Sequence, residues 1–271
     1  MARKFVLSPT RLRMYFRCPA EYRLEYIDKL GRLYHRARAG HAFGHSLHRA
    51  LEAFHAAGGS ETVSEQALTD SLETLWVAKG YQGEEQEAQF REEGARILRE
   101  YHAAQVAARD ALQTAPPPVL LYAEKTLRID LTPEIALSGR IDRVDEHPDG
   151  SLEIVDYKSG RETVSVEDVS SSLALNIYQV LLKARHPDRR VFSTLVALRT
   201  GAKASYELPE TDRLSLTAEC AETGEEIRSK DWESVKPVPN DHCPHCDFLP
   251  HCSRYWQREE RRNRLPMAPG V

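Results

Sequence analysis

The sequence has no apolar run that approaches the length of a membrane span. Its first nine residues carry two charges and no long apolar stretch, so we expect no secretory signal and a cytoplasmic location. It also has no excess of basic residues, because its formal net charge is −4. This balance neither indicates nor excludes a nucleic-acid partner, since a local basic groove is enough to hold phosphates. The Gly-x4-Gly-Lys-Ser/Thr phosphate loop is absent too, so the chain has no evident helicase motor.

Cysteine is scarce, with five in 271 residues, and the count is odd. A secreted disulfide framework favours an even number in a shorter chain. We therefore expect free thiols, metal ligands or nucleophiles. The hydrophobic fraction of 41% and the charged fraction of 29% are typical of a soluble globular protein with a sizeable core.

The expected elements change character along the chain. A proline run at 116–118 separates a first, helical part from a second part that mixes strands and helices. We expect one domain of the α/β class over residues 1–271, with an N-terminal helical part at 8–115, a core at 119–230 and a cysteine-containing tail at 231–271. The expected helices are 8–30, 41–57, 64–79, 84–110, 173–185 and 211–230, and the expected strands are 119–128, 135–145, 152–158 and 191–198.

Carboxylates and a lysine occupy the end of the strand at 152–158. Side chains alternate faces along a strand, so Asp156 and Lys158 share the face that Leu152 and Ile154 begin. If this strand and the one before it form a hairpin, Asp142 can approach Asp156. Two carboxylates beside a lysine suit a hard divalent cation such as Mg²⁺, which can drive phosphodiester hydrolysis. A surface ion pair at the end of a strand explains the same spacing.

Four histidines lie on one stripe of the helix expected at 41–57. At about 100° per residue the apolar side chains fall on the opposite face. A solvated helix face explains this stripe without any function. Its members are His41, His45, His48, Glu52 and His55.

The cysteines near the C-terminus have metal-ligand spacing. Cys243, Cys246 and Cys252 form a C-x2-C-x5-C pattern that lacks a fourth ligand, for which Cys18 is the candidate. Four thiolates suit an iron–sulfur cluster or structural zinc. In a zinc site one of the histidines at 242, 245 and 251 could substitute for a thiolate. Cys220 fits no spacing and is expected to be an ordinary helix cysteine.

Two segments, Gly139–Asp145 and Ile154–Gly160, resemble motifs II and III of the PD-(D/E)XK nuclease superfamily, in the form found in RecB-like nucleases. The resemblance implies a restriction-endonuclease-like core, in which helices flank a mixed sheet. It implies that Asp142 and Asp156 bind Mg²⁺ or Mn²⁺ and that Lys158 is catalytic.

Further positions follow from the same resemblance. The backbone carbonyl of Tyr157 would add a metal ligand, and Glu124 lies in a strand where related enzymes often carry a glutamate, although a solvated glutamate fits as well. Gly44-x3-His48-x2-Leu51-Glu52 resembles the first helix motif of RecB-like nucleases, whose histidine completes the metal site. This favours His48, and leaves His41, His45 and His55 solvated.

A downstream helix motif of the family often reads Gln-x-x-x-Tyr. Tyr178 matches it, but Ala174 stands where the glutamine would be, and an apolar core helix explains the segment equally well. The resemblance therefore implies catalytic roles for Asp142, Asp156, Lys158, Glu124 and Tyr178, and Mg²⁺ or Mn²⁺ ligands at His48, Asp142, Asp156 and Tyr157.

The cysteine pattern is similar to that of AddB-type nucleases and of the CRISPR-associated RecB-like exonucleases. The resemblance implies a [4Fe–4S] cluster that joins the N- and C-terminal segments, with structural Zn²⁺ as the alternative. Its implied ligands are Cys18, Cys243, Cys246 and Cys252.

Together these resemblances imply a metal-dependent DNA exonuclease on single strands or DNA ends, in repair, recombination or defence. The implied partner is DNA, with a separate helicase as a further partner and no membrane. Two alternatives stay open: a catalytically weak module that binds DNA ends within a helicase–nuclease complex, and a zinc-bound interaction protein.

Overall fold

The computed structural model describes residues 4–111 and 116–264, and the chain divides into two compact units. Unit 1 consists of Met1–Pro9 and Ala37–Gly224, and unit 2 of Thr10–Arg36 and Glu225–Val271. His48 therefore lies in unit 1 and Cys18 in unit 2. No helix among the described residues is both long and apolar enough to cross a membrane.

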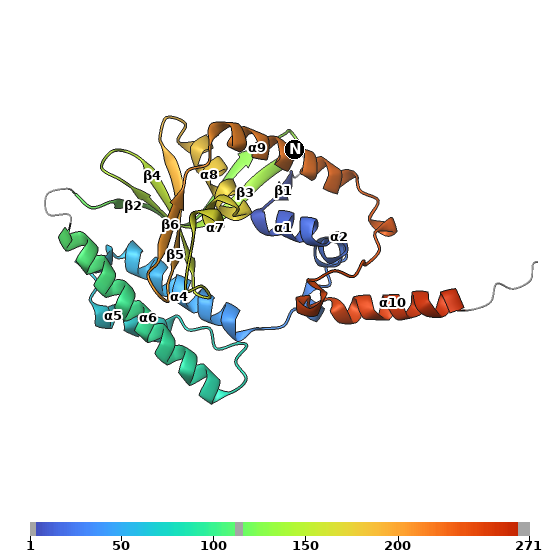
Figure 1. Ribbon diagram of the computed structural model, residues 1–271, viewed down its shortest axis with the longest axis horizontal. Coiled ribbons are helices and arrows are strands. Elements are labelled where there is room, and N and C mark those ends of the chain that lie inside the picture. The colour runs from blue at the N-terminus through green and yellow to red at the C-terminus, as the bar shows by residue number, and fades with distance from the viewer. Residues whose placement is uncertain (1–3, 112–115, 265–271) are drawn as a thin grey trace, which may run out of the picture. The chain divides into compact units, whose positions relative to one another are not determined.

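Unit 1 is built on a six-stranded mixed sheet (Figure 1). The strands run in the order β1-β3-β4-β5-β6, and β2 pairs with β3. β1 with β3 and β4 with β5 are parallel pairs, and the other pairs are antiparallel. The strands are β1 (Phe5–Leu7), β2 (Val119–Asp130), β3 (Ile135–Glu146), β4 (Leu152–Lys158), β5 (Val191–Ala197) and β6 (Lys203–Tyr206).

Helices flank this sheet, which confirms the predicted restriction-endonuclease-like α/β class (Figure 1). On one side α4, α5 and α6 pack their buried leucines and phenylalanines against Val155 and Val196 of the sheet. On the other side α8 packs against β3, β4 and β5. The helices that contribute to unit 1 are α4 (Ala39–Ala56), α5 (Glu65–Thr74), α6 (Glu84–Ala111), α7 (Val166–Ser170), α8 (Leu173–Arg185) and the first part of α9 (Glu210–Ser229).

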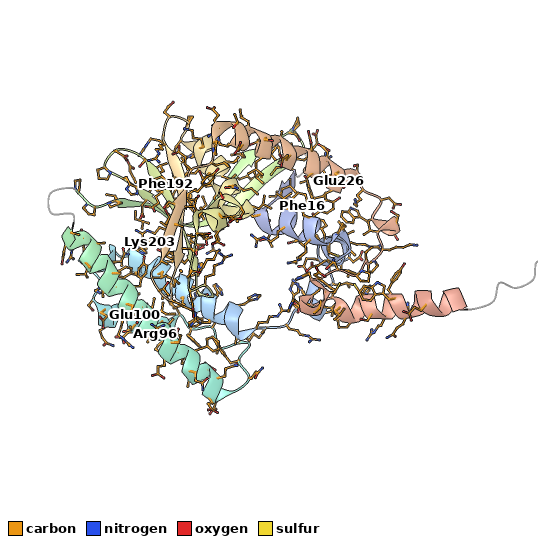
Figure 2. The ribbon with its side chains drawn as sticks, in the orientation of Figure 1. Phe16, Arg96, Glu100, Phe192, Lys203 and Glu226 are labelled. Carbon is orange, nitrogen blue, oxygen red and sulfur yellow. The ribbon has the colours of Figure 1, made fainter. Side chains whose placement is uncertain are left out.

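Local signals account for several helix boundaries. Ser64 and Ser172 cap α5 and α8, because their side chains accept hydrogen bonds from the backbone N–H groups three residues later. α8 has the bounds that the sequence predicts. The outer side of α6 is charged: Arg96 pairs with Glu100 on its surface (Figure 2).

One edge of β3 has a gap in its pairing. On this edge β1 pairs with residues 135–137 and β4 pairs with residues 143–146, whereas β2 follows β3 along the other edge. Residues 138–142 have no strand partner on this edge among the described residues. Gly139 lies in the gap, and a Cβ atom there would come within 2.8 Å of the Tyr178 ring, so glycine permits α8 to approach the strand.

Unit 2 joins an N-terminal and a C-terminal segment. The predicted single helix over 8–30 is wrong, because it breaks at Cys18, whose backbone is extended (φ −161°, ψ 105°). Pro19 disfavours the helical conformation for the residue before it and begins the next helix instead. The elements of unit 2 are α1 (Pro9–Arg17, which begins in unit 1), α2 (Pro19–Tyr22), the π-helix η1 (Arg23–Ile27), α3 (Gly31–Tyr34), the end of α9, the short 3-10 helices η3 (Trp232–Ser234) and η4 (Cys243–His245), and α10 (Leu249–Arg264).

Aromatic rings hold the two segments of unit 2 together. The rings of Tyr15 and Tyr22 pack edge to face with centroids 5.6 Å apart, and Tyr22 stacks on Trp232 at 5.3 Å. Arg23 donates a hydrogen bond to the carbonyl of Trp232 at 2.6 Å. Unit 2 therefore has an aromatic core in addition to its cysteines.

Candidate active site and cysteine cluster

Helix α4 approaches the end of β4 closely at Gly44. A Cβ atom there would lie 2.9 Å from Oγ of Ser159, which directly follows β4. One turn later, His48 faces the same strand: its Nε2 donates to the carbonyl of Tyr157 at 3.1 Å. The spacing Gly44-x3-His48 thus has a physical reason, because the glycine permits the contact that the histidine makes.

The other ring nitrogen of His48 meets β3. Its Nδ1 lies 3.1 Å from Oδ2 of Asp142. Burial works to lower the pKa of His48, but the hydrogen bond to Asp142 and the charges of Asp142 and Asp156 outweigh it and raise this pKa above its ordinary value. The histidine is therefore held in a strongly anionic setting.

Asp142 lies where the pairing of β3 with β4 ends. Its side chain accepts a hydrogen bond from the backbone N–H of Tyr157 at 3.4 Å. The register ends at Arg143–Val155, so a side-chain carboxylate takes the place that a strand partner would occupy. The gap in β3 thus turns a carboxylate toward the end of β4.

Asp156 and Lys158 end β4 as an ion pair. Lys158 Nζ lies 2.5 Å from Oδ2 of Asp156, which is 7% exposed. Burial raises the pKa of Asp156, the positive charge of Lys158 opposes this, and the nearby charge of Asp142 adds to it. The lysine side chain is 41% exposed and so can reach a ligand from solvent.

Glu124 of β2 completes a group of three donors. Ligand atoms of His48, Glu124 and Asp142 all lie within 4.8 Å of one another. Burial and the charge of Asp142 raise the pKa of Glu124, while an ion pair with Arg140 opposes the rise. Glu124 has a φ of 46°, a left-handed conformation that non-glycine residues rarely adopt, so backbone strain accompanies this position.

These donors line a narrow cavity between α4 and the sheet, and a second recess adjoins it. His48, Glu124, Asp142 and Tyr157 line the first. His48, Glu124 and Arg140 also line the second. Tyr178 is not among the described residues that line either cavity. Its ring lies against Gly139 on the α8 side of β3.

His55 is not solvated, and that expectation was wrong. It is 8% exposed and accepts hydrogen bonds from Tyr101 and Arg143, each at 2.8 Å. Burial, aided by the charge of Arg143, lowers the pKa of His55 to about 2, so the ring is neutral. His41 and His45, on the same helix, are exposed as expected.

Sequence reasoning also missed the charged network around His55. Arg143 and Asp145 form a buried ion pair, with Arg143 Nε 2.7 Å from Asp145 Oδ1. The hydroxyl groups of Tyr101 and Tyr157 also accept from Arg143, each at 3.1 Å. The signal was present in the sequence: an arginine and an aspartate two positions apart on one strand point to the same face.

Four thiols gather in unit 2. Cys18 caps α2, where its Sγ accepts from the N–H of Glu21 at 3.4 Å, and Cys243 Sγ accepts from the N–H of Asn240 at 3.3 Å. Cys246 follows η4 and Cys252 lies in α10. All four line one cavity: Cys18, Cys243, Cys246 and Cys252.

Burial and the neighbouring thiols raise the pKa values of Cys246 and Cys252. Burial raises the pKa of Cys252 to about 12, and the negative charges of Cys246, Cys18 and Cys243 add to this. Burial likewise raises the pKa of Cys246 to about 11. Such crowding disfavours four free thiolates and suits a cation that would hold them. N–H···S hydrogen bonds of the kind seen here also support metal-bound thiolates.

A histidine and a carboxylate lie beside these thiols. Ligand atoms of Glu21, His242 and Cys246 are within 4.8 Å of one another. Glu21 also pairs with Arg17, at 2.7 Å and 3.0 Å. Cys220 is buried within α9 in unit 1, in agreement with an ordinary helix cysteine.

Comparisons with known proteins identify the family. The crystal structure of SSO0001 is similar to this chain with a TM-score of 0.31 and 13% sequence identity, covering 62% of this chain and 78% of that chain. No curated protein matches the sequence significantly. The sequence model of the PD-(D/E)XK nuclease superfamily matches residues 6–253, which run from β1 past Cys252. Because this match covers most of the chain, the protein belongs to the PD-(D/E)XK nuclease superfamily, a group of metal-dependent nucleases.

Proposed function

We propose that this protein is a DNA exonuclease that hydrolyses phosphodiester bonds at single strands or DNA ends with Mg²⁺ or Mn²⁺. Nucleases of the superfamily use such metals and act on DNA. One observation carries the proposal: His48, Asp142 and Glu124 converge where the pairing of β3 ends, beside the Asp156–Lys158 pair of β4. Oxygen-rich donor sets of this kind suit hard divalent cations.

The residues fit such a cation. Burial raises the pKa values of both Asp156 and Glu124, and the charge of Asp142 raises them further, although Lys158 and Arg140 oppose the rise; a bound cation would relieve the repulsion among these carboxylates. Neighbouring ligands on an octahedral Mg²⁺ are about 3 Å apart, given metal–oxygen distances of about 2.1 Å. The 3.1 Å between Nδ1 of His48 and Oδ2 of Asp142 agrees with that spacing. The other ring nitrogen of His48 donates to the Tyr157 carbonyl and would orient it. The proposed ligands are Asp142, Asp156, His48 and the Tyr157 carbonyl, with Glu124 as a further donor.

The chain's own groups would act around that cation. A bound Mg²⁺ or Mn²⁺ supplies Lewis acidity and lowers the pKa of water for attack on phosphorus. Lys158 orients the attacking water or stabilises the charge that develops on the phosphate, from its position on Asp156. Arg140 is 64% exposed and lines the adjoining recess, where its guanidinium can hold a neighbouring phosphate. Tyr178 supports β3 through Gly139 in this proposal and does not touch the reacting atoms.

A RecB-like or AddB-like identity within the superfamily is part of the proposal. Its support is the gathering of Cys18 with the C-x2-C-x5-C cysteines, for which we propose a [4Fe–4S] cluster. Phosphodiester hydrolysis needs no redox step, so the cluster would be structural and would tie the two segments of unit 2 together. Structural Zn²⁺ is the second candidate, favoured by the closeness of His242 to Cys246.

The proposed setting is DNA repair, recombination or defence in the cytoplasm, alone or with a separate helicase. A catalytically weak module that only binds DNA ends would need no lysine beside Asp156. A zinc-bound interaction protein would leave the donors around His48 without a role. Cleavage assays separate these candidates.

The decisive experiment uses anaerobically purified protein. End-labelled linear single strands, linear duplexes and circular single strands are incubated with Mg²⁺, Mn²⁺ or EDTA. We expect linear substrates to be shortened from an end, circles to resist, and EDTA to stop the reaction. Asp142→Asn should be inactive, whereas the matched change Asp188→Asn, at an exposed turn position, should cleave normally. Binding of ends without cleavage under any metal would refute the proposal in favour of the weak module.

A further inference from the structure

A buried polar network lies directly behind the candidate metal site, and nothing in the proposed chemistry uses it. Its centre is Arg143, the residue after Asp142. The guanidinium group pairs with Asp145 through Nε and Nη2. On its other side, the two hydrogens of Nη1 are shared among three acceptors: His55, Tyr101 and Tyr157. All these side chains are largely buried, and Asp145 is only 3% exposed.

Stability alone does not explain such a network. Removing two charges from water costs several kcal/mol per ion, and apolar side chains of similar volume are often at least as stabilising. The surroundings are largely apolar, because Tyr101, Tyr157 and Val155 belong to the core between the sheet and α4–α6. The guanidinium is nevertheless well satisfied, since it has Asp145 as its counter-charge and a neutral His55 as an acceptor.

The network reaches the candidate site through one residue. The hydroxyl group of Tyr157 binds Arg143 at 3.1 Å and Tyr101 at 3.0 Å. The backbone of the same residue makes two contacts in the site: its carbonyl accepts from His48 at 3.1 Å, and its N–H donates to Asp142 at 3.4 Å. Tyr157 is thus anchored by its side chain and presents both of its peptide groups to proposed metal ligands.

We propose that Arg143 is a positioning residue, which acts through the Tyr157 hydroxyl to hold the Tyr157 backbone against His48 and Asp142. This inference rests on the proposed function, because it assigns the network to the metal site. Arg143 follows Asp142 on β3, so one strand carries both a ligand and the anchor of the neighbouring ligand. Outer contacts of this kind commonly change metal affinity by about 10–100-fold when they are lost.

Two matched substitutions separate positioning from stability. Tyr157→Phe and Tyr101→Phe each delete one hydroxyl group from the same network, and both rings are buried. Only Tyr157 also contacts the proposed ligands through its backbone, whereas Tyr101 lies on α6 and makes no such contact among the described residues. Affinity for Mn²⁺ is measured from the electron paramagnetic resonance signal of free Mn²⁺, which needs no cleavage, and thermal unfolding is measured in parallel.

We expect Tyr157→Phe to weaken Mn²⁺ binding at the proposed site by about 10-fold and Tyr101→Phe by less than about 2-fold, with similar losses of melting temperature. Cleavage by Tyr157→Phe should recover at saturating Mn²⁺. Arg143→Lys, which keeps the charge but loses the planar fork, should resemble Tyr157→Phe. Equal Mn²⁺ affinity in wild type and Tyr157→Phe would overturn the inference alone. If Asp142→Asn binds Mn²⁺ and cleaves DNA as well as wild type does, the proposed metal site itself is overturned, and the inference with it.

Discussion

His48 on α4 and Asp142 on β3 meet at 3.1 Å, between Nδ1 of the imidazole and Oδ2 of the carboxylate. The contact is made where β3 has no strand partner on one edge, so two distant parts of the chain meet at an opening in the sheet. The same histidine reaches the carbonyl of Tyr157 with its other nitrogen. One side chain thus links the helix to both strands that carry the proposed ligands.

Removing this link should impair metal use. We expect His48→Ala to raise the Mn²⁺ concentration needed for half-maximal cleavage by at least about 10-fold, because a proposed ligand is lost. The control is His41→Ala, an exposed histidine on the same helix, which should change this concentration by less than about 2-fold. Cleavage measured across a Mn²⁺ titration gives the result. Matching curves for the two variants would remove His48 from the site.

Lys158 should matter for rate rather than for folding. We expect Lys158→Ala to lower the cleavage rate at saturating metal by about 100-fold or more, as happens when a group that stabilises transition-state charge is deleted. Lys125→Ala, which removes an exposed lysine from β2, is the matched control and should keep its full rate. Circular dichroism verifies that both are folded. Full activity in Lys158→Ala would contradict its catalytic assignment.

Glu124 combines a carboxylate with a strained backbone, and two substitutions separate them. Glu124→Gln keeps the side-chain shape and should weaken Mn²⁺ binding with little change in stability. Glu124→Gly also removes the donor, but relief of the left-handed φ should offset part of the loss of packing, by up to about 1 kcal/mol. Mn²⁺ titration and urea unfolding measure the two effects. Unchanged Mn²⁺ affinity in both variants would restrict Glu124 to its ion pair with Arg140.

The four gathered cysteines should hold one metal centre. We expect Cys18→Ser to lose most of the bound metal and to lower the melting temperature, because the centre closes a very long loop. Cys220→Ala should keep its full metal content, although a small cavity in α9 can cost some stability. Iron, sulfide and zinc analysis of anaerobic protein gives the readout: equal iron and sulfide support the cluster, and one zinc supports the alternative. Undiminished metal in Cys18→Ser would remove this residue from the centre.

His55 should make the protein less stable below neutral pH. Its pKa falls from about 6.5 in the unfolded chain to about 2 in the folded protein. The neutral ring therefore makes its full contribution to the free energy of unfolding above pH 6.5. As the pH falls below 6.5 only the unfolded chain gains the proton, which lowers the free energy of unfolding by up to about 1.4 kcal/mol per pH unit. Between pH 7.5 and 5.5, the free energy of unfolding should therefore fall by about 1.4 kcal/mol less in His55→Gln than in wild type, as measured by urea unfolding.

The control for this prediction is His41→Gln, which alters an exposed histidine on the same helix. It should keep the pH dependence of wild type. If His55→Gln also keeps it, His55 is protonated or solvated in the folded protein.

Local patterns in the sequence were sufficient for much of the fold. Alternation along 152–158 predicted β4 with its bounds and placed Asp156 and Lys158 on one face, because a strand has a fixed period of two. The bounds of α8 were also predicted, since Ser172 marks its cap. These features depend on neighbours in sequence, which a single chain records directly.

Features that depend on distant partners were not predictable in this way. His55 shares the polar stripe of α4, yet Tyr101 and Arg143 cover it from α6 and β3, so its periodicity alone suggested solvent. β1 has three residues, too few for an alternation to be read, although its end defines the gap beside Asp142. The left-handed backbone at Glu124 was not predictable, because glycine or asparagine usually marks such a conformation in a sequence and neither is present at this position.

Unit 2 combines an early segment of the chain, from Thr10, with a late one, from Glu225, and this order has a consequence during synthesis. The ribosome releases Cys18, Tyr15 and Tyr22 long before Trp232 and the C-terminal cysteines exist. At about 5–20 residues per second, translation of the intervening chain takes roughly 10–40 s. Most of unit 1, which ends at Gly224, is synthesised in that interval, while the early aromatic rings and thiol wait without their partners. Newborn chains are therefore most vulnerable to aggregation and thiol oxidation before their last residues emerge.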